Sequence, residues 1–310
     1  MPRNRTDVDI DGQTLSISNL DKVLYPAAGF TKGQLIDYYA RIAPVMLPHL
    51  EDRAVTFRRY PDGVEGTSFF EKQAPSHTPA WVRRTRVPRS TEERGRGAKS
   101  GDDIEFAVID DRATLLWAAN LAAIELHVPL WRVGDGSEIP ARPDLLVFDL
   151  DPGPGTSIVE CCTVAGWLSS YLEAEGLGPV LAKTSGSKGL QLYVAVTDGI
   201  DWSSDRERTL QIASAIERDH PDRVVTKMRR ALRQNKVLID WSQNHPTKTT
   251  VAAYSLRAQA EPTVSAPVSW QEVTQCAKRA DPALLRFCAH DVLRRVDARG
   301  DLFSPLLVNR

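Results

Sequence analysis

The feature that most constrains this chain is an apolar stretch, residues 145–155, that ends in two aspartates and a Pro-Gly-Pro-Gly run. Its first part has the composition of a strand, and the run ends that strand because Pro lacks an amide donor and Gly lacks conformational restraint. Side chains alternate between the faces of a strand, so Asp149 and Asp151 share one face. Like charges this close repel unless something neutralises them, and a divalent cation is the usual solution. The simpler alternative is a turn in which Asp151 caps the following loop.

A second strand-like segment, residues 236–242, carries Asp240 near its end. If this segment lies beside the first, three aspartates could bind two divalent ions roughly 3.5–4 Å apart, the arrangement for in-line phosphoryl or nucleotidyl transfer. A strand-end aspartate bonded to backbone amides is the alternative.

Composition bounds the class of protein. The 310 residues are 42% hydrophobic and 25% charged, as in soluble globular proteins with a substantial core. No apolar run approaches a membrane span and the polar start does not resemble a secretory signal, so we expect a cytoplasmic protein with no membrane partner. The four cysteines, Cys161, Cys162, Cys276 and Cys288, fit neither a disulfide framework nor a zinc pair, and we expect buried thiols.

The net charge of −1 gives no support for a nucleic-acid partner, but the basic residues cluster. Phosphate backbones require local positive charge rather than a high overall pI. A solvated basic face is the more common explanation for one such run. The two runs are Lys227, Arg229, Arg230, Arg233 and Lys236, and Arg83, Arg84, Arg86 and Arg89.

Two N-terminal features could contact a nucleic acid. Thr31 and Gln34 form a capping box that predicts a helix start, and Lys22 and Lys32 flank it, where amides and the helix dipole favour a phosphate. The alternative is two ordinary surface lysines. Adjacent phenylalanines in residues 69–70 cannot both enter one core from a strand, so an exposed ring could stack on bases. Core packing with one ordinary surface aromatic is equally open.

A loop rich in hydroxyls and glycine, residues 184–189, lies between two strand-like segments. Its amides, its hydroxyls and Lys188 could hold a triphosphate, although a plain hairpin turn explains it as well. It is not a Walker A loop. His127 follows an apolar run and is either a structural histidine or a phosphate contact.

The remaining pattern predicts an α+β fold. We expect helices over 114–126 and 158–175, and another that Ser204 caps and that extends to about residue 218. We also expect a capping box at Ser269 before a C-terminal helical pair, and an exposed, mobile loop over 90–103.

Seven short motifs stand in a fixed order: NLDKVLYP (19–26), FFEKQ (69–73), HVP (127–129), VFDLDPG (147–153), TSGSKGL (184–190), IDWSQN (239–244) and YSLR (254–257). Together they closely resemble the polymerase domain of bacterial DNA ligase D and its stand-alone relatives, in the archaeo-eukaryotic primase superfamily. The resemblance covers nearly the whole chain.

The resemblance implies an archaeo-eukaryotic primase fold, in which an RRM-like catalytic lobe (about 141–260) joins a second α/β lobe (about 1–140) that grips DNA. A helical tail (261–310) would pack back. It further implies template-dependent addition of nucleotides, preferably ribonucleotides, at gaps and broken ends, with two Mn²⁺ or Mg²⁺ ions.

By motif, Asp149, Asp151 and Asp240 would hold the metals, and His127, Ser185, Ser187, Lys188, Gln243 and Arg257 the nucleotide. Lys22 and Lys32, with Asn19 and Arg58, would grip a 5′-phosphate, Phe69 and Phe70 would stack on the template, and Arg233 would position the primer end or bridge two breaks.

The sequence departs from the family's pattern in three respects. Arg58 stands where the family often has Lys, the 227–236 loop is longer, and we expect a stand-alone polymerase with no attached ligase or nuclease segment. We therefore expect NTPs and gapped or broken DNA with a 5′-phosphate as ligands, a separate ATP-dependent DNA ligase and possibly Ku as partners, and a place at the bacterial nucleoid. Gap filling in base excision repair and non-homologous end joining both fit. A non-catalytic end-bridging module and a de novo primase remain alternatives.

Overall fold

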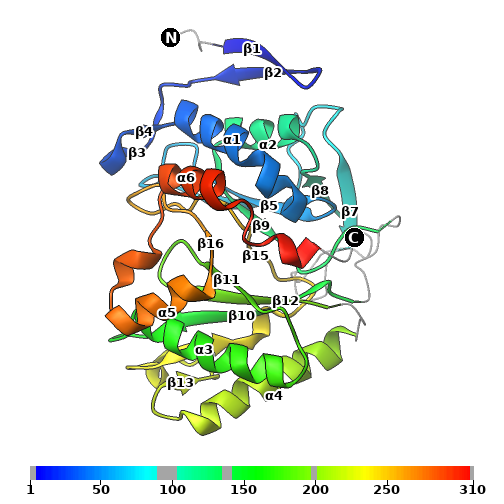
Figure 1. The fold of residues 1–310 in the computed structure, drawn as a ribbon. Helices are drawn as coiled ribbons and strands as arrows, with labels where there is room; N and C mark the ends of the chain where they lie inside the picture. Colours follow the sequence, from blue (N-terminus) through cyan, green and yellow to red (C-terminus); the bar gives the residue numbers. More distant parts are fainter. Residues whose placement is uncertain (1–4, 89–102, 135–141, 197–200, 308–310) are drawn as a thin grey trace.

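Two six-stranded sheets form the centre of the computed structural model, which describes residues 5–88, 103–134, 142–196 and 201–307 (Figure 1). The sheet that carries the aspartates has the strand order β13-β14-β10-β12-β11-β16. The other has the order β15-β9-β5-β8-β7, and β6 also pairs with β5. The strands of these sheets are β5 (Ala54–Arg59), β6 (Phe69–Glu71), β7 (Arg84–Pro88), β8 (Asp103–Val108), β9 (Ala123–Val128), β10 (Leu145–Pro152), β11 (Leu181–Thr184), β12 (Leu190–Ala195), β13 (Val224–Val225), β14 (Val237–Asp240), β15 (Thr250–Val251) and β16 (Pro267–Val268).

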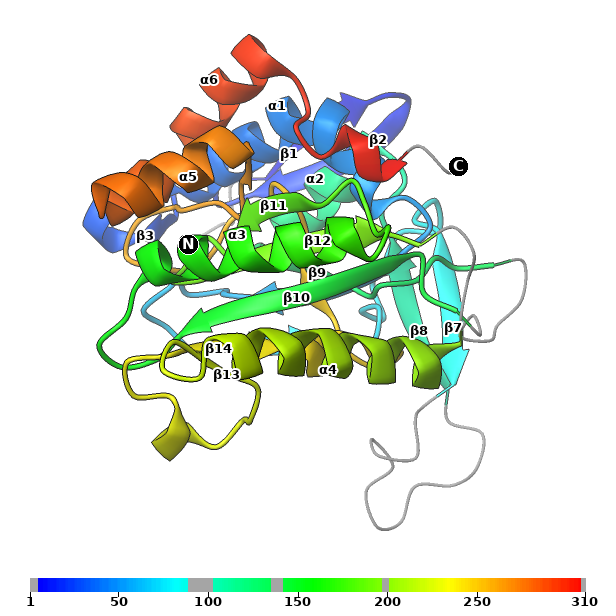
Figure 2. The ribbon, with the colours of Figure 1, turned by 60° about the horizontal axis from the view of Figure 1, so that its bottom comes forward.

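The aspartate-bearing sheet contains a β-α-β-β-α-β unit, β10-α3-β11-β12-α4-β14. Within it the spatial order is fourth, first, third, second strand, and all neighbours are antiparallel, which is the ferredoxin-like arrangement of RRM domains. Both helices run alongside β10 (Figure 2). The prediction of an α+β fold with an RRM-like lobe is therefore confirmed. The two helices are α3 (Ile158–Ala174) and α4 (Trp202–Asp219).

The two sheets share one core. Helices α1 and α2 pack on each other and, through β9, on the second sheet, and their apolar residues belong to the same buried cluster as Val147 and Tyr193 of the first sheet. Strand β15 precedes residue 260 but joins the second sheet, and β16 follows residue 260 but joins the first. The sheets therefore do not follow the expected lobe boundaries at 140 and 260, and the division of the chain into two lobes and a tail stays a prediction. The other elements are β1 (Arg5–Ile10), β2 (Gln13–Ser18), β3 (Val23–Tyr25), β4 (Phe30–Thr31), α1 (Lys32–Leu50), α2 (Arg112–Asn120), α5 (Trp270–Arg279), α6 (Ala289–Arg299) and 3-10 turns at Pro26–Ala28, Arg230–Leu232, Trp241–Gln243, Pro282–Leu285 and Ser304–Leu307.

The helix predicted over 114–126 is wrong at its C-terminal end. Helix α2 ends at Asn120, Ala122 has a positive φ of 57°, and the chain turns into β9 between β5 and β15. A run of mostly apolar residues fits the periodicity of a helix and that of a strand equally well. Here, pairing with β5 makes the run a strand.

The predicted Ser204 cap is also wrong. Asp201 is the N-cap of α4, and its carboxylate accepts hydrogen bonds from the amides of Ser203 and Ser204. The capping boxes at Thr31 and Ser269 are confirmed.

Other expectations have mixed outcomes. Three cysteines are buried thiols, whereas Cys288 is half-buried. The expected loop over 90–103 lies outside the described residues except for Asp103, which begins β8. No helix in the described parts of the chain is long and apolar enough to cross a membrane.

Replacing Arg53 with Met should destabilise the fold by about 3 kcal/mol. The Arg53 side chain is 2% exposed, and its guanidinium pairs with Asp144 and donates to the carbonyls of Pro129 (3.0 Å) and Trp131 (3.1 Å). The substitution would leave the two carbonyls without this donor and Asp144 with Arg132 as its remaining arginine partner. Urea unfolding of both proteins measures the difference.

Arg112→Met is the matched control. Arg112 pairs with Asp11, but the two side chains are 47% and 56% exposed. The control should lose less than about 1 kcal/mol. Equal losses in the two variants would contradict a structural role for the buried arginine.

Candidate active site

The three predicted aspartates come together on adjacent strands. Asp149 on β10 lies directly opposite Asp240 on β14, and Asp151 lies two residues further along β10 on the same face. Burial and the charges of Asp151 and Asp240 raise the pKa of Asp149 to about 7. Burial and Asp240 also raise the pKa of Asp151, while Arg233 lowers it. This site crowds negative charge and favours any cation that relieves it.

Two residues that the sequence analysis did not single out extend this row across the sheet. Gln191 lies opposite Asp149 on one side and opposite Lys183 on the other. Lys183 is 1% exposed, and its ammonium donates to Gln191 and to Ser265 Oγ (2.8 Å). A Lys and a Gln inside apolar strand segments were the available signal, because a buried polar side chain requires a partner.

The donor chemistry fits a hard divalent cation, but the three carboxylates do not form a ready-made chelate. Asp240 accepts from Ser242 Oγ (2.6 Å), from the Ser242 amide (2.9 Å) and from Gln243 Nε2 (2.9 Å). Within the described segments, no group of three or more His, Cys, Asp or Glu side chains is gathered closely enough to hold an ion. Asp149 accepts a hydrogen bond from Gln191 and lies near the amine of Lys183, and Asp151 lies near the guanidinium of Arg233.

The predicted phosphate loop lies against the end of β10. A Cβ on Gly189 would lie 2.4 Å from Leu150 O and 3.6 Å from Asp151 Oδ1. Ser185 Oγ accepts from the amides of Ser187 (3.2 Å) and Gly189 (3.0 Å), which fixes the loop. Ser187 and Lys188 are exposed. The loop therefore presents an ammonium, a hydroxyl and backbone amides beside the carboxylates.

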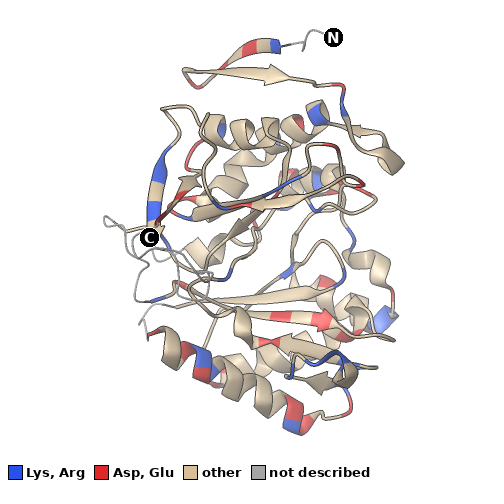
Figure 3. Cartoon of the chain, turned by 180° about the vertical axis from the view of Figure 1, so that it is seen from behind, with Lys and Arg blue, Asp and Glu red and all other residues tan. Residues whose placement is uncertain are grey.

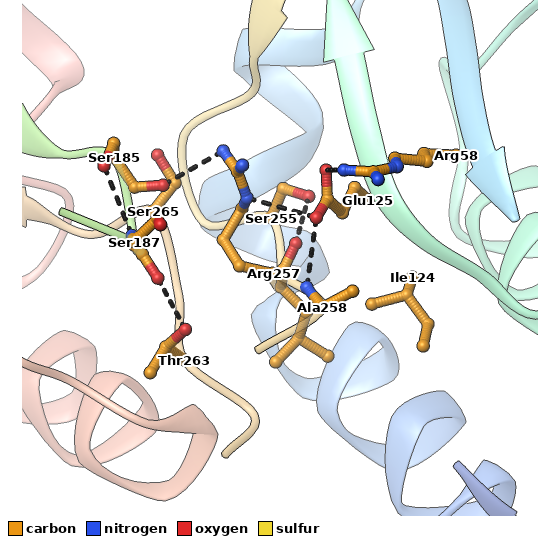
Figure 4. A network of polar contacts seen from close by, with 12 residues as sticks. Arg58, Ile124, Glu125, Ser185, Ser187, Ser255, Arg257, Ala258, Thr263 and Ser265 are labelled. Atoms are coloured by element: carbon orange, nitrogen blue, oxygen red, sulfur yellow. Dashed lines mark hydrogen bonds and ion pairs between the residues drawn. The ribbon is translucent and has the colours of Figure 1, made fainter. Parts of the chain in front are cut away.

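Sequence reasoning missed Glu125, which the structure places among the side chains of His127, Arg257 and Arg58. It is fully buried on β9 and accepts a hydrogen bond from His127 Nε2 (2.9 Å). Arg257 Nε lies 3.3 Å from one of its oxygens and Arg58 Nη1 3.6 Å from the other (Figure 4). Arg257 also donates to the Ser185 carbonyl (3.1 Å), so the structure joins His127, Arg257 and the phosphate loop.

The two lysines predicted to grip a phosphate lie close together. Lys32 is 5% exposed, and its ammonium donates to Ser18 O (2.6 Å) and Asn120 Oδ1 (2.7 Å). Lys22 pairs with Asp62 (2.8 Å). Asn19 accepts from the Lys22 amide through its carbonyl, in the turn before β3. Burial and the charges of Lys22 and Arg59 lower the pKa of Lys32 to about 8.

Arg58 does not lie with Lys22 and Lys32. Its neighbour Arg59 lies near Lys32, and neighbouring residues of a strand point to opposite faces, so Arg58 lies against Glu125 instead. Its guanidinium stacks over the ring of Phe70 at 5.2 Å. Phe69 and Phe70 are 43% and 58% exposed, as the strand argument allowed, and Phe70 contacts the ring of His127 edge-on at 5.5 Å.

The basic loop, residues 227–236, packs directly on the turn that follows Asp151 (Figure 3). The Gly153 amide donates to Lys236 O (2.9 Å), and the Asn235 amide donates to Pro154 O (2.8 Å). A Cβ on Gly153 would lie 1.9 Å from Arg233 O, so only glycine permits this approach. Arg233 donates to Met228 O (2.6 Å) within the loop. The other basic run is largely neutralised, since Arg83 pairs with Asp52 and Asp110, and Arg84 and Arg86 with Glu105.

Known proteins resemble this chain over most of its length. A family model described as "LigD, primase-polymerase domain" matches residues 31–303. The multifunctional non-homologous end joining protein LigD of Mycolicibacterium smegmatis is 40% identical over 294 residues, 95% of this chain and 36% of the relative. The bifunctional non-homologous end joining protein LigD of Bacillus subtilis is 30% identical over 296 residues, 95% of this chain and 44% of the relative.

Among solved structures, the polymerase domain from Mycobacterium tuberculosis Ligase D in complex with DNA matches with a TM-score of 0.85. The two share 38% sequence identity, and the match covers 95% of this chain and 98% of that one. By contrast, the chain spans well under half the length of the curated relatives named above.

Gly153→Ala should displace the basic loop without unfolding the protein, because the added Cβ would overlap the Arg233 carbonyl. Trypsin should then cleave within residues 227–236 several-fold faster, since local opening governs such cleavage. Gly166→Ala in α3 is the control, because a Cβ there meets nothing within 4 Å. Identical cleavage patterns for the two variants would show that the turn does not hold the loop.

Proposed function

The chain belongs to the LigD primase-polymerase family, and from this premise we propose that it adds nucleotides to primer 3′-ends at short DNA gaps and double-strand breaks. As a member it is a DNA-directed nucleotidyltransferase. The observation that carries the proposal is the row of three carboxylates beside a loop of hydroxyls, amides and a lysine. Nucleotidyl transfer requires both parts, one at the reacting oxygens and one on the triphosphate.

The carboxylates fit a metal-dependent reaction, and we propose two Mn²⁺ or Mg²⁺ ions. Asp149, Asp151 and Asp240 would hold them. Bound ions would lower the pKa of the primer hydroxyl and offset the charge of the leaving pyrophosphate. The pKa of Asp149, raised to about 7 by burial and by the charges of Asp151 and Asp240, supports this assignment because a bound cation would offset these effects.

The nucleotide would lie between the phosphate loop and the Glu125 cluster. Arg257 and Lys188 supply positive charge to the triphosphate, and Ser185 and Ser187 supply hydroxyl or amide groups. His127 is hydrogen-bonded to Glu125. Arg257 also contacts Glu125 and donates to the Ser185 carbonyl, so these contacts connect His127 to the same loop. Gln243 binds Asp240, so its role includes orienting that carboxylate as well as contacting the nucleotide. These charges act where negative charge develops in the transition state.

The DNA side of the proposal draws on the relatives. The Mycobacterium tuberculosis domain was solved with DNA, and the related proteins are named for non-homologous end joining. We propose that Lys22, Lys32 and Asn19 contact a 5′-phosphate, that Phe69 and Phe70 stack on the template, and that Arg233 serves the primer end. We further propose ribonucleotide preference, use in excision-repair gaps as well as breaks, action at the bacterial nucleoid, and cooperation with a DNA ligase and Ku.

Asp149→Asn should abolish nucleotide addition, by roughly 10³-fold or more, because it removes one charge from the site where the ions bind. The assay is extension of a primer across a one-nucleotide gap, with and without the 5′-phosphate, and with ribo- and deoxyribonucleotides in parallel. Binding of the same gapped DNA, measured by fluorescence anisotropy, should survive.

Asp222→Asn provides the control, since Asp222 is an exposed carboxylate beyond the end of α4. It should extend the primer like the wild type. Extension at the wild-type rate by Asp149→Asn would refute the two-ion site. Tight DNA binding by a wild type that never extends a primer would favour the end-bridging alternative.

Preference for a 5′-phosphorylated gap should fall as the pH rises from 7 to 9. Burial lowers the pKa of Lys32 to about 8, so the ammonium is charged and attracts phosphate below this pH, and is neutral above it. The affinity ratio of phosphorylated to unphosphorylated DNA reports the effect. Lys32→Gln should show a small ratio that does not vary with pH across this window, and a wild-type ratio that stays constant would argue against Lys32 as the phosphate contact.

A further inference from the structure

Glu125 is a buried anion that three basic side chains share. It is fully buried, and its Oε1 accepts from the Ala258 amide (3.0 Å). Arg257 and Arg58 lie on either side of the carboxylate (Figure 4), and His127 also contacts it. A buried carboxylate is costly unless it is paired in this way. Burial raises the pKa of Glu125, but the hydrogen bond from His127 and the charge of Arg257 bring it down to about 2, so the group is charged at any working pH.

The partners of Glu125 connect it to two different sites, the phosphate loop and the exposed ring of Phe70. Arg257 reaches the phosphate loop through the Ser185 carbonyl. Arg58 instead lies over the exposed ring of Phe70 at 5.2 Å, on the side where the template was placed. The Arg58 side chain is 34% exposed while Glu125 is 1% exposed, so Arg58 can leave for an external phosphate and Glu125 cannot follow.

We propose that Glu125 is a positioning residue that couples the two sites, so that DNA bound at Arg58 and Phe70 strengthens the binding of the incoming triphosphate. The inference rests on the proposed function. The guanidinium groups of Arg58 and Arg257 flank the same carboxylate and repel each other, so the departure of one relieves the other. When a DNA phosphate draws Arg58 away, the carboxylate holds His127 and Arg257 more firmly in the orientation that faces the loop. By linkage, bound triphosphate strengthens DNA binding by the same factor.

Template pairing would also strengthen nucleotide binding, so the test removes it. The DNA carries an abasic site at the templating position and a primer that lacks its 3′-hydroxyl, and the probe is ATP with Mn²⁺. Isothermal titration gives the ATP affinity with and without this DNA. The wild type should bind ATP at least about 5-fold more tightly when the DNA is present.

Two variants test the roles of Glu125 and Arg58 in this coupling separately. Glu125→Gln keeps the shape and an acceptor for the Ala258 amide, and should bind ATP weakly with or without DNA, giving a ratio near one. Arg58→Met removes the competing partner for good, and should bind ATP at the wild type's DNA-bound affinity even without DNA. Should Glu125→Gln fail to fold, Arg58→Met still decides the matter.

Glu272→Gln is the matched control. Glu272 on α5 also pairs with two arginines, Arg295 and Arg299, and has a pKa lowered to about 2 against the opposing effect of burial. It should keep the wild-type ratio. A wild-type ratio of one, or a full ratio in Glu125→Gln, would overturn the coupling while leaving the polymerase assignment intact. A wild type that extends no primer in the gap assay would instead overturn the proposed function.

Discussion

Asp149 and Asp240 lie opposite each other on hydrogen-bonded strands, and Asp151 lies on the same face, so like charges meet at the middle of a sheet. The row continues through Gln191 to the buried amine of Lys183, whose pKa burial lowers well below its usual value while the charge of Asp149 opposes that change. When charged, this amine lowers the pKa of Asp149, yet burial and the other aspartates still hold that pKa at about 7. The compensation is therefore partial, and the remaining repulsion makes the face attractive to cations.

Around Glu125 the crowded charges are positive instead of negative. The guanidinium groups of Arg257 and Arg58 repel each other when no anionic ligand is bound, and the buried carboxylate between them holds both in place. The phosphate loop lies between these two centres, since Gly189 abuts the end of β10 and Ser185 receives Arg257. A ligand that is itself anionic and brings cations satisfies both centres at once, which a nucleotide with its metal ions does.

The sequence was informative wherever the chemistry lies within a few residues. The strand that breaks at Pro-Gly-Pro-Gly, the loop between β11 and β12 and the capping boxes at Thr31 and Ser269 could all be predicted, because each depends on local backbone geometry. Strand alternation predicted that at least one of Phe69 and Phe70 is exposed, and the structure exposes both. The pairing of the two aspartate strands was a hypothesis that needed the sheet to confirm it.

What could not be predicted depends on partners far apart in the chain. The apolar run around Glu125 indicates burial, as for Lys183 and Gln191, but its partners could not be predicted, because Arg58 and Arg257 come from β5 and from the segment after β15. Residues 121–126 satisfied a helical period, and only the neighbouring strands make them β9. The same interleaving explains why Glu125 can link two sites. Its strand pairs with β5, whose Arg58 lies under the exposed aromatic ring, and with β15, which leads into the segment that carries Arg257.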